Sequence, residues 1–517
     1  MSTKAAPQIP DDARDWVGSD LILRDQIIST VVEVLKRHGG VPMDTPALEP
    51  GSPPTEGDDG KDGRLALNLD NEGGFLQSDL TAPFARWLAM NPYINHMKRY
   101  QIGKTYRRER GKHGKHKRKL MVKEGYQCQF DIAGKYDAMI PEAEILRIVS
   151  EVCHALALDV TIRVNHARIL NGILTVAGVP DGKIREVGLA VGKLDECWER
   201  WGNMVRKEIV RKHGMDEEVA DRIRHYVLRK GGVKDMIELL EHDSELVGND
   251  DVRAGLREME LLTTYLRVLG VDNVSFDFSL ARHGLEHCYS GLTYDVALRL
   301  PCPAEPPANN RPRKKSKPIA GSVATGGRHD NLAQGCKRDA IPSASVSFDI
   351  NHMFDLLSAA RSTETTTGSN VLRNEVDVYI MAFGGDSGNG NRTGFSRGFL
   401  LERMAIARQL WDAGIRAEYW PKAELGSPFS QVKNAVKRAV KSGARLLVIL
   451  GREEHNHNDS VRLQILGRTV EEKRRDKRNH RWLVPRQNVV EEVKKMLLQM
   501  DRPQAEGAGK PGKSGRG

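Results

Sequence analysis

The chain has 517 residues, a length that predicts two to four domains. Its content of 39% hydrophobic and 29% charged residues is typical of a soluble globular protein. The net charge of +10 is compatible with a polyanionic partner such as RNA. No apolar run reaches about 18 residues and the first residues lack an apolar signal segment, so neither a membrane span nor a secretory signal is expected.

The cysteines and histidines do not predict a metal site. The six cysteines are Cys128, Cys153, Cys197, Cys288, Cys302 and Cys336. None of them forms a CxxC pair, so neither a zinc site nor a disulfide framework is expected, and a reducing compartment is the default. His455 and His457 resemble a metal pair, but alternating histidines in a polar loop are usually solvated.

The first part of the chain reads as a helix, a strand and a hairpin. Apolar residues at helical spacing predict a helix over 14–38, which Gly39 and Gly40 end, and a strand follows over 41–50. After a polar loop, LALNLD and GGFLQSDLT predict a hairpin that leads into a helix. Asp79 and Thr81 would share one strand face and could bind an α-ammonium group. The alternative is that Asp79 caps the helix.

Residues 98–137 carry the strongest signal. Two strand-like runs, joined by a basic and glycine-containing loop, predict a hairpin that can cover an anion. Arg107 can direct two N–H groups to a phosphate, and Glu109 lies on the same strand face, where it could accept from an exocyclic amine. Gln127 and Asp131 share one face of the second run. The alternative is a solvated basic hairpin.

The rest of the chain alternates between helical, loop and mixed segments. An amphipathic helix is predicted over 138–158, and a helical block over 183–270. Residues 301–319 are Pro-rich and basic and predict an exposed loop, while 359–374 predict a Ser/Thr-rich linker. From residue 375 strands and helices alternate, which predicts an α/β unit with a mixed or parallel sheet.

Several of these segments resemble one family. KRYQIGKTYRRER and YQCQFDIAGKYDAMIPEAE resemble motif 2 of class II aminoacyl-tRNA synthetases, in the form found in histidyl-tRNA synthetases of the eukaryotic type. VPMDTPALEP resembles motif 1, a dimer-interface strand in the family, and FDFSLARHGLEHCYSGLTYDVAL resembles the histidine-specific segment S-L-A-R-G-L-D-Y-Y-T-G. GSVATGGRHDNL resembles the second histidine-specific motif, in which glycines let the backbone approach the substrate.

The resemblance implies an α+β fold. The catalytic core would be a class II antiparallel sheet in two parts, interrupted by a helical insertion and followed by an α/β anticodon-binding domain. The implied boundaries are 1–182 and 271–358 for the core, 183–270 for the insertion, 375–500 for the anticodon-binding domain and 501–517 for a disordered tail.

The resemblance also implies roles for individual residues. Arg107 and Arg282 would be catalytic and neutralise the α-phosphate of ATP, and Glu109 would orient adenine. The implied histidine-binding residues are Asp79, Leu80, Thr81, Arg107, Gln127, Asp131, Arg282 and Tyr289. Among them, Asp131 and Tyr289 would recognise the imidazole.

The implied activity is that of a histidine–tRNA ligase. It would use ATP and Mg²⁺ to activate histidine and transfer it to tRNA(His), as a homodimer in the cytoplasm or, alternatively, in mitochondria. This chain departs from the family pattern where motif 3 belongs, because Asp349, Asn351 and His352 stand there without the usual arginine. Gln77 and Ser78 replace the family's Arg-Tyr, and the histidine-specific loop has two extra residues. The alternative function is therefore a synthetase-like protein that binds histidine or tRNA without aminoacylation.

Overall fold

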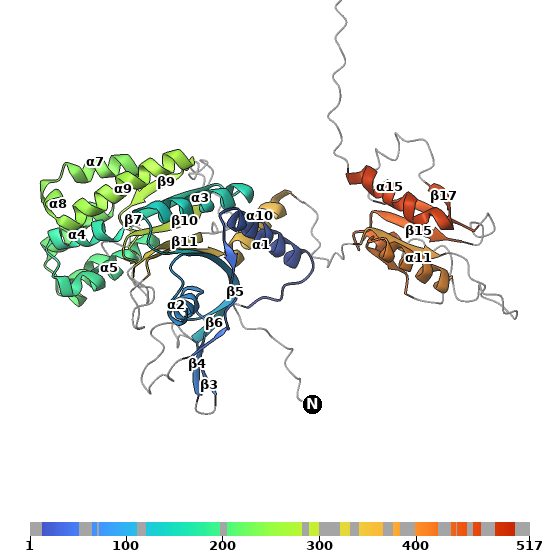
Figure 1. The fold of residues 1–517 in the computed structure, drawn as a ribbon, viewed down its shortest axis with the longest axis horizontal. Coiled ribbons are helices and arrows are strands. Elements are labelled where there is room, and N and C mark those ends of the chain that lie inside the picture. The colour runs from blue at the N-terminus through green and yellow to red at the C-terminus, as the bar shows by residue number, and fades with distance from the viewer. Residues whose placement is uncertain are drawn as a thin grey trace, which may run out of the picture. The chain divides into compact units, whose positions relative to one another are not determined.

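The computed structural model describes residues 13–50, 65–69, 72–110, 120–196, 204–281, 289–298, 321–330, 341–364, 376–382, 399–421, 436–440, 442–451, 459–466 and 481–501. They fall into two compact units, which divide near residue 366 (Figure 1). No helix in these ranges is long and apolar enough to cross a membrane.

The first unit contains a large sheet, a small sheet and most of the helices. Its helices are α1 (Ser19–Arg37), α2 (Thr81–Met90), α3 (Ile140–Ala155), α4 (Ala167–Ala177), α5 (Ile184–Gly192), α6 (Glu217–Val227), α7 (Val233–Glu241), α8 (Ser244–Gly248), α9 (Asp250–Leu269) and α10 (Ile350–Glu364). Its strands are β1 (Val41–Pro42), β2 (Leu48–Pro50), β3 (Leu65–Leu69), β4 (Glu72–Leu76), β5 (Met97–Arg110), β6 (Leu120–Ala133), β7 (Val160–His166), β8 (Lys230–Gly232), β9 (Val274–Asp277), β10 (Leu292–Leu298), β11 (Ser322–His329) and β12 (Ser343–Asp349).

The large sheet has nine strands in the order β1-β5-β6-β12-β11-β10-β7-β9-β8. The six strands from β5 to β7 in this order pair antiparallel with one another, whereas β1 pairs parallel with β5 and β9 pairs parallel with β7. The predicted hairpin over 98–137 is confirmed as β5 and β6, which pair along their full length. The small sheet has the order β2-β4-β3 and contains the predicted β3–β4 hairpin.

The register gives the large sheet one apolar and one polar face. Side chains alternate between faces along a strand, so residues paired across neighbouring strands share a face. One such row is Tyr100, Phe130, Val346, Gly326, Tyr294 and Val164, and its side chains belong to the main hydrophobic core. The neighbouring row is Arg99, Asp131, Ser345, Gly327, Thr293 and Asn165. The polar row therefore forms a continuous floor on the opposite face.

Helices cover the apolar face. Buried residues of α1, α3 and α9 share one hydrophobic cluster with the apolar rows of the sheet. Figure 1 shows α1, α3 and α10 along one side of the sheet, with α2 and the β3–β4 hairpin on the other. The predicted helical block over 183–270 contains α5 to α9, with α9 packed against α3 and α4, but it also contains the short strand β8, which was not predicted.

The second unit is a five-stranded mixed sheet with helices, as predicted. Its described elements are β13 (Val378–Ala382), α11 (Leu400–Asp412), β14 (Ala417–Tyr419), β15 (Leu446–Leu450), β16 (Ser460–Ile465), β17 (Arg481–Pro485) and α15 (Val489–Asp501). The order is β14-β13-β15-β16-β17, with the first three strands parallel and the last two antiparallel. Strand β17 was not predicted.

The predicted linker over 359–374 begins too early, because α10 continues to Glu364, and the predicted tail lies outside the described residues.

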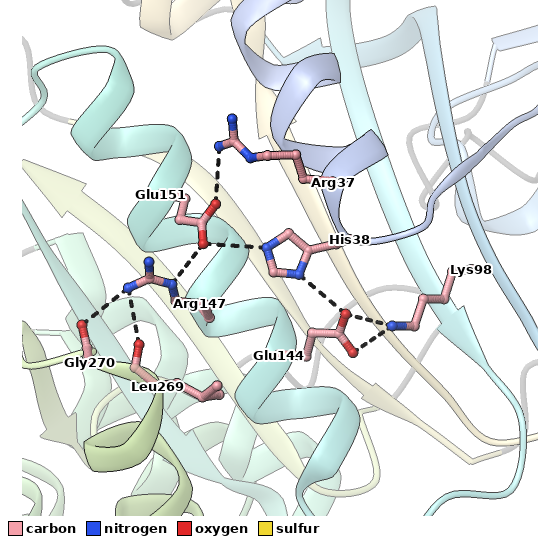
Figure 2. A network of polar contacts seen from close by, with 8 residues as sticks. All are labelled: Arg37, His38, Lys98, Glu144, Arg147, Glu151, Leu269 and Gly270. Carbon is pink, nitrogen blue, oxygen red and sulfur yellow. Dashed lines mark hydrogen bonds and ion pairs between the residues drawn. The ribbon is translucent and has the colours of Figure 1, made fainter.

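A network of ion pairs joins α1, β5, α3 and the end of α9 (Figure 2). Each ring nitrogen of His38 faces a carboxylate of α3, with Nδ1 3.3 Å from Glu144 Oε1 and Nε2 3.5 Å from Glu151 Oε1. Lys98 of β5 donates to Glu144 at 2.6 Å. Arg147 donates to Glu151 at 2.8 Å and to the carbonyl oxygen of Leu269 at 3.0 Å. The network thus fixes the β5 edge of the sheet to two covering helices.

The same network changes the acidity of its carboxylates. Burial alone raises the pKa of Glu144, but hydrogen bonds from His38 and Lys98 outweigh it, so the pKa is lowered overall. The pKa of Glu151 is lowered in the same way, with burial opposed by Arg147 and Arg37. Because the folded state holds both carboxylates ionised, their contribution to stability is present above the unfolded pKa and is lost as pH falls through the lower folded value.

We expect Glu144→Gln to lower the free energy of unfolding at pH 7 by about 1–2 kcal/mol, because it replaces charge-assisted hydrogen bonds with neutral ones. The difference from the wild type should shrink below about pH 4.5, the ordinary value for a glutamate. Urea unfolding at about six pH values between pH 3 and 7 measures both effects. The control is Glu33→Gln on the exposed side of α1, which makes no ion pair within the described ranges. An equal loss in both variants, or a difference independent of pH, would contradict the prediction.

Gly326 of β11 lies where two groups approach the backbone closely. A Cβ atom there would meet the Ser345 carbonyl oxygen and the Tyr294 hydroxyl well inside van der Waals distance. The Tyr294 hydroxyl donates to that same carbonyl oxygen at 2.5 Å, and the ring is almost fully buried. The glycine therefore allows a buried tyrosine to lie flat across the apolar face.

We expect Gly326→Ala to destabilise the protein by roughly 3 kcal/mol, since backbone on one side and a buried ring on the other must both move. Thermal and urea unfolding measure the loss. Gly182→Ala is the matched control, because nothing lies within 4 Å of a Cβ atom at that position. The interpretation would be wrong if both variants were equally stable.

Candidate active site

A buried ion pair lies at the β5 end of the polar floor. Arg99 Nη2 lies 2.7 Å from Asp131 Oδ2, and both side chains have 0% exposure. Arg99 also donates to Leu80 O at 2.7 Å and to Gln101 Oε1 at 3.0 Å, and its guanidinium lies 4.2 Å from the ring centre of Phe84. Burial raises the pKa of Asp131, and the charge of Arg99 opposes this shift. The ion pair with Arg99 holds the carboxylate in one orientation on the polar face of the sheet.

The start of α2 is attached to this pair. Gln129 donates through Nε2 to Thr81 Oγ1 at 2.8 Å and to Asp131 Oδ1 at 3.0 Å. Together with the bond from Arg99 to Leu80 O, this brings three of the predicted site residues, Leu80, Thr81 and Asp131, into one cluster. Arg99 and Gln129 were not singled out in the sequence, although both alternate with predicted residues along their strands.

Asp79 has a structural role at this position. The sequence prediction that Asp79 and Thr81 share a strand face is wrong, because Thr81 is the first residue of α2. Asp79 Oδ1 accepts from Thr81 N at 2.8 Å and from Ala82 N at 3.0 Å, so it satisfies backbone donors in the first turn of the helix. Asp79 therefore binds the first turn as a capping residue would, although it lies one residue before the N-cap, Leu80.

Gln127 lies further along the same floor. It pairs with Gly103 of β5 and with Asp349 of β12, so its side chain lies on the face that carries Asp131. Its Oε1 atom is buried and has no hydrogen-bond partner within the described ranges. A buried acceptor without a partner is costly, and a bound donor such as an ammonium group would satisfy it.

Arg107 lies near the far end of β5. Its Nε donates to Ser78 O at 2.8 Å, and its side chain is exposed. Gln77 fixes the same segment to β5, because its Nε2 donates to Lys104 O at 2.7 Å. The two Nη groups of Arg107 make no hydrogen bond within the described ranges, which leaves them available for an anion. Glu109 follows in β5 opposite Met121, but its side chain lies outside the described part of the structure.

Tyr289 lies beside the glycines of β11. Its ring is 4.5 Å from the ring of His329, and a Cβ atom on Gly327 would be 2.5 Å from its Cδ1. The sequence predicted that the glycines of this segment let the backbone approach the substrate. In the structure, Tyr294 packs against Gly326 and Tyr289 packs against Gly327. A small pocket beside Tyr289 is lined by Asn165, His166, Leu170, Leu280 and Thr293. Arg282, the predicted second catalytic arginine, lies outside the described residues.

The residues at the motif 3 position support the sheet and its helix. Asp349 Oδ1 accepts from His352 N at 2.9 Å, in the first turn of α10. Asn351 Oδ1 accepts from Tyr126 N at 3.2 Å, which ties α10 to β6. The His352 ring packs against Gly321, where a Cβ atom would be 2.8 Å from Cε1, and its Nε2 is buried without a partner in the described ranges.

The described residues contain no group of three His, Cys, Asp or Glu side chains that could hold a metal ion. Magnesium usually keeps several waters and binds proteins through one or two carboxylates together with substrate phosphates.

Comparisons with known proteins agree with the fold and the motifs. The family model described as "Histidyl-tRNA synthetase" matches residues 13–353. The mitochondrial histidine–tRNA ligase of Saccharomyces cerevisiae is 38% identical over 464 residues, covering 86% of this chain and 80% of that protein. The histidine–tRNA ligase of Danio rerio is 36% identical over 497 residues, covering 93% of this chain and 87% of that protein.

A solved structure shares the fold. The histidyl-tRNA synthetase from Nostoc sp. PCC 7120 has a TM-score of 0.67 and 21% sequence identity, covering 95% of this chain and all of that one. The matched family model spans the nine-stranded sheet and its helices up to the start of α10. The resemblance found in the sequence is confirmed, and the chain belongs to the histidyl-tRNA synthetase family.

Proposed function

We propose that the chain is a histidine–tRNA ligase, which activates histidine with ATP and transfers it to tRNA(His). The polar floor around Asp131 carries this proposal, since it holds a carboxylate, an unpartnered amide oxygen and a glycine-backed tyrosine on one face. Family membership and the relatives named histidine–tRNA ligase support it.

In the first step the histidine carboxylate attacks the α-phosphorus of ATP and pyrophosphate leaves. In the second step the terminal ribose hydroxyl of the tRNA attacks the aminoacyl carbonyl and AMP leaves. Such reactions are accelerated by positioning and by stabilisation of charge on the phosphate. Arg107 would place its two Nη groups on the α-phosphate from the β5 side, and Arg282 would act from the other side. Glu109 would accept from the adenine amino group, and Mg²⁺ bound to the phosphates would neutralise the leaving pyrophosphate.

Recognition of histidine would use the floor. The Asp131 carboxylate has about four acceptor sites, so it can bind an imidazole N–H while it holds Arg99 and Gln129. Tyr289 would enclose the ring. Gln127, Asp79 and Thr81 would bind the amino-acid backbone groups. Such a site rejects apolar amino acids strongly, because they would leave its buried polar groups unpaired.

The second unit and the sheet edge suggest further partners. The α/β unit after residue 375 would bind the tRNA anticodon, as the resemblance implies. Strand β1 ends the large sheet, and Val41 is 52% exposed there, so this edge is the candidate surface for a homodimer. The curated relatives include cytoplasmic and mitochondrial enzymes, and the cytoplasmic location stays a prediction.

A second candidate function rests on His352. The family's ATP-binding arginine is absent, and the ring in its place packs under Gly321. A chain that binds histidine or tRNA without forming the adenylate would fit this observation.

We expect the purified protein to catalyse histidine-dependent ATP–pyrophosphate exchange. Arg107→Ala should lower kcat/KM about 10- to 100-fold, through the loss of a charge-assisted bond of about 1.5–3 kcal/mol to the phosphate. The matched control is Arg257→Ala, an exposed arginine of α9. No exchange from a folded chain that still binds tRNA would reject the ligase and favour the second candidate.

We expect His352→Arg to lower the KM for ATP by about tenfold, because a guanidinium that reaches the phosphates adds a charge-assisted hydrogen bond. The KM for histidine should not change. Pyrophosphate exchange at varied ATP and varied histidine separates the two constants. His352→Gln is the neutral control. If ATP binding were equal in all three proteins, position 352 would not lie near the phosphates.

A further inference from the structure

A second ion pair, between partly buried Arg328 and buried Glu142, lies behind the polar floor. Arg328 alternates with Gly327 and His329 along β11, so its side chain lies on the apolar face, toward α3. Its Nη1 donates to Glu142 Oε1 at 2.7 Å, and Glu142 is only 1% exposed. Arg328 keeps 21% of its side chain exposed. An ion pair with one fully buried partner adds little net stability compared with apolar residues of similar volume, which points to what the pair positions.

Arg328 fixes the segment that follows Tyr289. Its carbonyl oxygen accepts from Ser290 N at 2.9 Å. Its Nε donates to Asp330 Oδ1 at 2.7 Å, and Asp330 N in turn donates to Ser290 Oγ at 2.9 Å. A Cβ atom on Gly291 would be 3.0 Å from Arg328 Cδ, so the arginine stem also packs under the next residue. The guanidinium thus holds Asp330, while the Arg328 carbonyl oxygen and Asp330 N hold Ser290, the residue that follows Tyr289.

Tyr289 is one residue from these contacts. Its ring packs on Gly327 and His329, the residues that precede and follow Arg328 in β11. A shift of Arg328 along the strand would therefore also shift Gly327 and His329, and with them the Tyr289 ring that packs on them. The connection from Glu142 to Tyr289 passes through only two residues, Arg328 and Ser290.

We propose that the Glu142–Arg328 ion pair is a positioning device for Tyr289, and that it sets the affinity of the site for histidine from the far face of the sheet. The proposal rests on the proposed function, because it assigns Tyr289 to the histidine pocket. Neither charged residue touches the substrate. The pair acts by fixing the turn that carries the tyrosine.

Glu142→Gln tests the proposal in pyrophosphate exchange. We expect the KM for histidine to rise about 10- to 100-fold, the range associated with a displacement of about 1 Å in a binding group. The KM for ATP should stay at the wild-type value. Glu142→Asp, which keeps the charge, should recover most of the histidine affinity. The control is Glu245→Gln, which removes the exposed ion pair with Arg222 in the helical block and should change neither constant.

A double variant distinguishes positioning from general damage. If Glu142 acts through Tyr289, the change from Glu142→Gln should largely disappear in a Tyr289→Leu background. Additive effects, or equal increases in both KM values, would overturn the proposal. Calorimetric titration with histidine gives a second readout. If the wild type bound histidine but catalysed no exchange, the ligase function would be rejected, and the titrations would still test the role of the Glu142–Arg328 pair. If the wild type bound no histidine, the ligase function and the positioning role would both be overturned.

Discussion

The active-site side of the sheet depends on the ion pair between Arg99 and Asp131. Both side chains have 0% exposure, and removal of one partner from such a pair costs roughly 3–5 kcal/mol because a buried charge is left alone. A pair of well-packed apolar residues would be at least as stable. The polar pair is therefore best explained by what it holds in place, the Asp131 carboxylate on one side and the start of α2, through Leu80 O, on the other.

The large sheet separates support from recognition. Its polar rows carry Asp131, Gln127 and the glycine on which Tyr289 rests, while its apolar rows pack against helices. Two charged residues on the apolar face attach strand ends to α3. Arg328, at the end of β11, binds Glu142. Lys98, at the start of β5, binds Glu144 (Figure 2). The pleat of the strands makes this division possible, because each strand contributes alternate side chains to the two faces.

The sequence predicted what local pattern determines. The β5–β6 hairpin, its shared face for Gln127 and Asp131, and the helices on either side follow from periodicity. Arg99 and Gln129 were missed, because both bind residues at the start of α2, and the sequence pattern does not show that this segment lies over the β5–β6 hairpin. Strand β17 was missed for a similar reason, since five residues carry little period-2 signal and their pairing partner is β16. Asp79 was misplaced on a strand because a helix that starts at Thr81 leaves the same short pattern in the sequence.

The departures at the motif 3 position have a consistent local explanation. Asp349 replaces the glycine that usually ends this strand, and its carboxylate accepts from the backbone of α10. Asn351 bonds the backbone of β6 on both sides of Gly125, so the helix start is attached to the hairpin that carries Gln127. His352 then packs under Gly321 instead of extending from the helix. All three residues therefore make local contacts that fix the start of α10 to the sheet.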